Sequence, residues 1–139
     1  MFTELDINLL SVLIAAVAAM AVGFLWYSPF LFGKVWMDLM GYSEEVAAQK
    51  KKGMPVKYFV SFLTSLLSGY VLACLIYLTA AETYVDALIL GVLIWLGFIA
   101  TTLLGGVLWH GKPLKLYFIT AGYYLAVFLA MSAIIFALI

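Results

Sequence analysis

Residues 7–33 read INLLSVLIAAVAAMAVGFLWYSPFLFG and contain no Asp, Glu, Lys or Arg. Three further charge-free stretches follow, at residues 58–81, 87–111 and 116–139. Each stretch is long enough to cross a bilayer, because a transmembrane helix needs about 20 consecutive apolar residues. The sequence therefore predicts an all-α integral membrane protein, built as a bundle of four transmembrane helices.

The overall composition agrees with a membrane protein. Of the 139 residues, 68% are hydrophobic and 10% are charged, whereas soluble domains are about 45–50% apolar and about 25% charged. This composition excludes soluble enzymes and nucleic-acid-binding proteins, and the single cysteine excludes a disulfide scaffold. We expect one transmembrane domain over residues 1–139, with spans at residues 7–27, 58–81, 87–109 and 116–139.

The lysines are confined to alternate connections between the spans. Five lie between the first and second spans and two between the third and fourth, whereas the N-terminal segment and the second connection carry only acids. Because lysine marks cytoplasmic loops, we expect a cytoplasmic loop at residues 28–57 and both termini outside the cytoplasm. The net charge of zero then divides into +4 on the cytoplasmic side, from seven lysines and three acids, and −4 on the other side.

The long first loop predicts two short helices. Ser28 and Pro29 are typical of a helix start, with Ser28 as the N-cap and Pro29 at the first helical position. Residues 30–40 have only a narrow polar stripe, so this amphipathic helix should lie in the cytoplasmic interface of the membrane and end at Gly41. A second helix is expected over residues 43–53, because acids at its start and lysines at its end suit the helix dipole.

Small residues spaced by four recur in every span, which favours close packing of helices in lipid. They are Ser11, Ala15, Ala19 and Gly23; Ser61, Ser65, Gly69 and Ala73; Gly97, Thr101 and Gly105; and Gly122, Ala126 and Ala130.

Polar side chains in three spans share one depth, about 10–17 Å from the lysine-bearing surface at about 1.5 Å of rise per residue. These candidate ligand-binding residues are Thr64, Ser65, Ser68, Thr101, Thr102, Tyr123 and Tyr124. Two interpretations stay open. The hydroxyls can bond to helix carbonyls within or between spans, or they can line a small cavity or a pore constriction.

The lysines form a second candidate site, for the phosphate head groups of anionic lipids. Its members are Lys34, Lys50, Lys51, Lys52, Lys57, Lys112 and Lys115. The other interpretation is that these lysines only set the orientation of the chain in the membrane.

Other chemistry has little support in the sequence. No charged residue lies inside a span, which disfavours ion-coupled transport. His110 and Cys74 are the only residues of their types and lie far apart, so we expect no metal site and no cofactor. An enzyme is not expected, and a membrane enzyme that acts on lipid is only the third hypothesis.

One segment resembles a known family. Its motif comprises Trp26, Tyr27, Ser28, Pro29, Phe32, Gly33, Lys34 and Trp36. This resembles the W-Y-S-P-x-L-F-G-K-x-W signature of an uncharacterised prokaryotic integral membrane family, domain of unknown function family 1761. The resemblance implies a four-helix protein of the prokaryotic cell (inner) membrane, with no established substrate. His110, Lys112 and Thr120 stand where glutamate, arginine and asparagine are common in that family.

These observations favour a non-enzymatic, multi-pass membrane subunit that binds membrane lipids or partner membrane proteins. A 15.3 kDa bundle is too small to enclose a wide pathway alone, so we expect a homo-oligomer or a subunit of a larger membrane complex. The alternative is a homo-oligomeric channel or facilitator for a small solute.

Overall fold

The computed structural model describes residues 2–139 of the chain. Four long apolar stretches of helix are present, which confirms the predicted all-α four-helix membrane bundle. They comprise α1 (Leu9–Trp26), α4 (Met54–Leu78), the continuous third span and α7 (Leu114–Leu138). The third span consists of α5 (Tyr84–Ile94), the π-helical segment η3 (Trp95–Ala100) and α6 (Thr101–His110).

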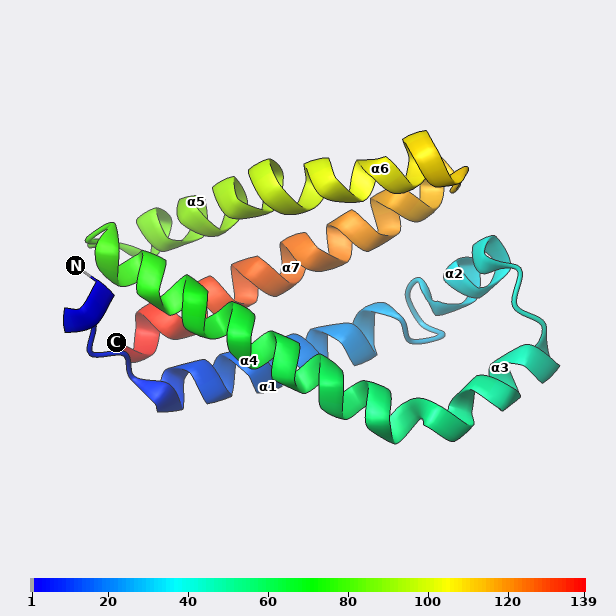
Figure 1. Cartoon of the computed structure of the whole chain (residues 1–139), viewed down its shortest axis with the longest axis horizontal. Coiled ribbons are helices and arrows are strands. Elements are labelled where there is room, and N and C mark those ends of the chain that lie inside the picture. The colour runs from blue at the N-terminus through cyan, green and yellow to red at the C-terminus, as the bar shows by residue number, and fades with distance from the viewer. Residues whose placement is uncertain (1) are drawn as a thin grey trace.

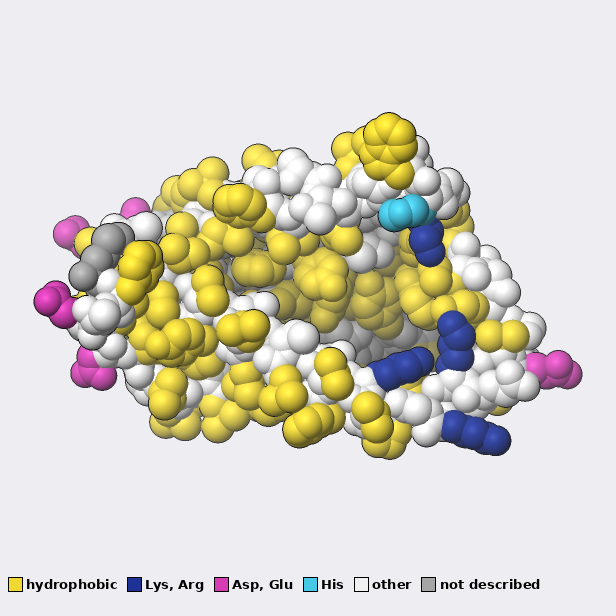
Figure 2. All heavy atoms as spheres, in the orientation of Figure 1, with side chains coloured by type: hydrophobic (Ala, Val, Ile, Leu, Met, Phe, Trp, Pro, Cys, Tyr) yellow, Lys and Arg dark blue, Asp and Glu magenta, His cyan; other side chains and the backbone are white. Residues whose placement is uncertain are grey.

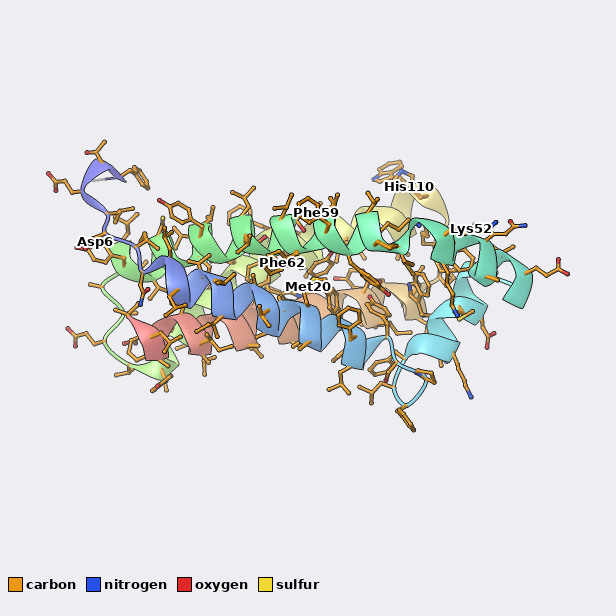
Figure 3. The ribbon with its side chains drawn as sticks, turned by 90° about the horizontal axis from the view of Figure 1, so that it is seen from below. Asp6, Met20, Lys52, Phe59, Phe62 and His110 are labelled. Carbon is orange, nitrogen blue, oxygen red and sulfur yellow. The ribbon has the colours of Figure 1, made fainter. Side chains whose placement is uncertain are left out.

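Shorter helices complete the described part of the chain. The segment η1 (Phe2–Glu4) precedes the first span, and α2 (Gly33–Met40), α3 (Glu44–Lys50) and η2 (Lys51–Gly53) lie in the first loop. Both ends of the chain lie at one end of the bundle (Figure 1). Acidic side chains gather at that end, called the acidic end below, and the lysines gather at the opposite, lysine end (Figure 2). Asp6 and Lys52 mark the two ends in Figure 3.

Helix α7 is the centre of the bundle, because it contacts α1, α4 and the third span. The buried core of Ala15, Ile76, Met131 and Ile135 lies in the half of the bundle toward the acidic end. At that end the Asn8 side chain donates a hydrogen bond to the Leu138 carbonyl oxygen at 2.8 Å. The acidic half is therefore closely packed.

The first loop differs from the sequence prediction at Ser28. The Ser28 hydroxyl donates to the Leu25 carbonyl oxygen at 2.7 Å, so it closes the end of α1 and does not cap the next helix. Helix α2 begins at Gly33, after a turn, and ends at Gly41 as predicted, with Gly41 in the left-handed region at a φ of 71°.

The helices of the second and third spans begin before the charge-free stretches at residues 58–81 and 87–111. The second span begins by Met54, because Pro55 lies in the first turn of α4, where a helix needs no proline N–H. The third span begins at Tyr84, because Thr83 and Asp86 form a capping box in which each side chain accepts from the other residue's backbone N–H.

Candidate functional site

The turn between α1 and α2 is tightly closed by its own backbone. The Phe32 N–H donates to the Trp26 carbonyl oxygen and the Gly33 N–H to that of Ser28, both at 3.0 Å. A methyl group at Gly33 would overlap the Tyr27 carbonyl oxygen. Only glycine fits at this position, so the turn fixes where α2 returns toward the bundle.

Aromatic side chains of this turn join α1, α2 and α7. The Trp26 indole N–H donates to the Ile119 carbonyl oxygen of α7 at 3.0 Å. The Tyr27 ring packs between Trp36 of α2 and Tyr123 of α7, with ring centroids 5.7 and 5.2 Å away. These contacts build one wall of a cavity at the lysine end.

The cavity has a volume of about 740 Å³ and is lined by α1, α2, α3, η2, α4, α7 and the loops beside α2. It lies within the range of about 300–1,000 Å³ that is typical of ligand pockets. Four lysines line it, one each from α2, α3, η2 and α4: Lys34, Lys50, Lys51 and Lys57. Seven hydroxyl side chains also line it: Tyr27, Tyr42, Tyr58, Ser61, Thr120, Tyr123 and Tyr124. No carboxylate is among the described residues that line the cavity.

Two of the tyrosines have defined electrostatic roles. The Tyr27 phenol is neutral at physiological pH, as an ordinary tyrosine is, and can donate a hydrogen bond; burial raises its pKa further, to about 12. The Lys50 ammonium lies 3.9 Å from the centroid of the Tyr42 ring and donates to the Tyr42 hydroxyl. The cavity thus combines positive charge with neutral hydrogen-bond donors, which suits an anionic group that carries several oxygen atoms.

Comparison with protein families assigns the chain to a family. The family model of DUF1761, described as a protein of unknown function, matches residues 10–136. The chain belongs to this family. The match confirms the resemblance to family 1761 and spans all four long helices except the outermost residues of α1 and α7. The chain matches no curated protein and no solved structure.

The structure separates the seven lysines of this DUF1761 chain into two groups. Lys34, Lys50, Lys51 and Lys57 line the cavity, whereas Lys52, Lys112 and Lys115 do not. His110 is exposed at the same end of the bundle and is also not a lining residue (Figure 3).

The polar residues that share one depth do not converge on one point. Tyr123 and Tyr124 line the cavity. The hydroxyls of Thr64, Thr101 and Thr102 donate to carbonyl oxygens of their own helical spans at 2.8, 2.8 and 2.5 Å. Ser65 and Ser68 are half-buried on α4, and Ser68 lines a separate groove that is described below.

Carbonyl groups of the π-helical segment η3 have additional partners. Thr101 and Thr102 donate to the carbonyl oxygens of Gly97 and Phe98, and the Tyr117 hydroxyl of α7 donates to that of Ala100 at 2.9 Å. A π segment disturbs the ordinary helical ladder, so side-chain donors stabilise its carbonyls. These threonines therefore support the helix and are not among the residues that line the cavity.

Five of the lining hydroxyl residues were not predicted as ligand-binding residues, although Tyr27 belongs to the family motif: Tyr27, Tyr42, Tyr58, Ser61 and Thr120. Signals for two of them exist in the sequence. Thr120 precedes Tyr124 by four residues, and Ser61 precedes Ser68 by seven, so each shares a helix face with a predicted residue.

Proposed function

We propose that this DUF1761 chain is a membrane protein that binds the head group of an anionic lipid in the lysine-lined cavity. The observation that carries the proposal is the lining itself, because four lysines and seven hydroxyls face the cavity with no carboxylate among the described lining residues. A phosphate group accepts hydrogen bonds from lysines and hydroxyls together. The same lining repels a cation.

The position of the cavity supports a lipid ligand. The lysines lie at one end of a bundle of membrane-spanning helices, and clusters of lysine at a membrane surface attract anionic lipids. Tyr27, Trp36 and Tyr42 lie beside them, and such rings are enriched at membrane–water interfaces. We propose that this end faces the cytoplasm, because lysine marks that side.

The lining also supports selection among head groups. Phosphatidylethanolamine and phosphatidylcholine carry a cationic group that would approach four lysines with no described carboxylate to pair with it. Phosphatidylglycerol carries one negative charge and free hydroxyls. We therefore expect the cavity to prefer phosphatidylglycerol over zwitterionic lipids.

Replacing two cavity lysines tests the proposal. We expect Lys34→Gln with Lys57→Gln to lower the retention of phosphatidylglycerol about a hundredfold or more in native mass spectrometry, because each of the two charged hydrogen bonds contributes about 1.5–3 kcal/mol. The matched control is Lys52→Gln with Lys112→Gln, which removes the same charge from the lysine end outside the cavity. Equal loss in both double variants, or loss in neither, would contradict a head-group site.

The channel alternative has less support. It needs the polar side chains of several spans around one pathway, whereas Thr101 and Thr102 bond to their own span and are exposed. A non-enzymatic lipid-binding subunit remains the function that the cavity supports best.

Self-association also remains a proposal, and the third span favours it. Among the described spans, this one buries the smallest share of its length. Its small residues Gly97 and Thr101 are exposed, and a methyl group at Gly97 would meet nothing within 4 Å. Light scattering of the purified protein in detergent tests whether Gly97→Leu lowers the molecular mass of the assembly.

A further inference from the structure

A second, apolar groove lies deeper in the bundle. Its volume is about 230 Å³, and it is lined by residues of α4 between Leu67 and Leu75, by Ile94 of α5 and by Phe128 of α7. Ser68 is the one polar side chain among the described lining residues. Such a lining suits a hydrocarbon chain and offers nothing to an ion.

The groove lies farther along the same faces of two helices that line the lysine-lined cavity. On α4, Ser61 lines the cavity and Ser68 lines the groove, and a spacing of seven residues puts both on one face. On α7, Tyr124 lines the cavity and Phe128, four residues on, lines the groove. At about 1.5 Å of rise per residue, the groove begins about 6–11 Å deeper than these cavity residues.

The groove is accessible from the side of the bundle. Leu67 and Val71, which line it, are 66% and 49% exposed, on helices that cross the membrane. Figure 2 shows a hollow in the surface of the molecule, with lysine side chains at one end of the hollow. A lipid could therefore enter sideways from the bilayer with its head group at the lysines.

We propose that the groove holds one acyl chain of the lipid whose head group occupies the lysine-lined cavity. This inference rests on the proposed function and narrows the ligand to a membrane-resident amphiphile with a long chain. A soluble phosphate compound fills only the cavity, whereas a lipid fills the cavity and the groove together.

A bulky residue in the groove tests the chain site. We expect Val71→Trp to lower the retention of long-chain phosphatidylglycerol about tenfold, because filling the groove displaces about two methylene groups. The matched control is Val17→Trp. Val17 is 55% exposed on α1 and lines neither the cavity nor the groove, so this variant should retain the lipid as the unchanged protein does.

The unchanged protein provides a second measurement that needs no variant. We expect long-chain phosphatidylglycerol to outcompete the short-chain form, and glycerol phosphate to compete poorly with both. Equal competition by glycerol phosphate would overturn the acyl-chain site and leave a site for a soluble anion. Unchanged retention in Val71→Trp together with loss in the Lys34 and Lys57 variant would overturn the chain site alone. Unchanged retention of phosphatidylglycerol in the variant with Lys34→Gln and Lys57→Gln would overturn the head-group site, and with it the chain site that depends on it.

Discussion

At the scale of single residues, the contact of α5 with α7 depends on Gly91. A methyl group at Gly91 would lie 2.5 Å from the Ser132 hydroxyl oxygen and 3.2 Å from the Phe128 carbonyl oxygen. Ser132 is fully buried, and its hydroxyl has no hydrogen-bond partner among the described residues. The close approach of these helices thus leaves one polar atom unsatisfied.

This pair predicts coupled changes in stability. Gly91→Ala should lower the free energy of unfolding by about 1–3 kcal/mol through overpacking. Ser132→Ala should raise it by about 1 kcal/mol, because a buried hydroxyl without a partner costs about that much. The free energy of unfolding should fall less in the double variant than in Gly91→Ala alone, because the Ser132 hydroxyl oxygen that clashes with the new methyl group is absent. Unfolding titrations in mixed detergent measure all three, and a loss of stability in Ser132→Ala would show that the hydroxyl has a partner in the membrane.

At the scale of elements, two hydrogen bonds from side chains connect the π-helical segment η3 to α7. The Trp95 indole N–H donates to the Ala121 carbonyl oxygen at 2.7 Å, and the Tyr117 hydroxyl donates to that of Ala100. Each bond crosses between helices and stabilises an irregular turn. The segment is therefore stabilised by α7 as well as by its own backbone hydrogen bonds.

Removing one of these donors should weaken the third span. We expect Tyr117→Phe to lower the free energy of unfolding by about 0.6–1.7 kcal/mol, the range for hydrogen bonds between membrane helices. Tyr70→Phe is the matched control, because it makes the same chemical change at a tyrosine that is 42% exposed on α4, away from η3. The same unfolding titration compares the two variants, and an equal effect would argue against a role for the bond between helices.

At the scale of the whole molecule, the two ends of the bundle differ in charge and in packing. The acidic end holds the core, and the lysine end holds the cavity. Segments that carry lysine stay on the cytoplasmic side during insertion. The same charges thus serve both the proposed orientation and the proposed head-group site.

Cysteine labelling tests the orientation. With Cys74→Ala as background, Ser43→Cys in the lysine-rich first loop should react with an impermeant thiol reagent only after the membrane is opened. Glu82→Cys, at the acidic end, should react in intact cells. Both positions are exposed. The reverse pattern would place the cavity on the outer surface and contradict the predicted topology.

The sequence predicted the spans because hydrophobic length and charge are local properties. It could not predict the cavity, because Lys34, Lys57 and Tyr123 come together only after α2 turns back at Gly33. Ser28 was assigned to the wrong helix, because a serine before proline looks like an N-cap until its acceptor is known. The π segment was missed because it leaves the apolar character of the third span unchanged.

The position of Trp36 provides an optical readout of the cavity. The chain has four tryptophans, and Trp36 is the one among the described residues that line the cavity. A lipid that carries a heavy-atom quencher near its head group should quench Trp36 when it occupies the cavity, and Trp109→Phe removes the exposed tryptophan outside the cavity that bulk lipid would quench. Occupancy can then be followed in bilayers by the fluorescence of Trp36, with no label attached to the protein.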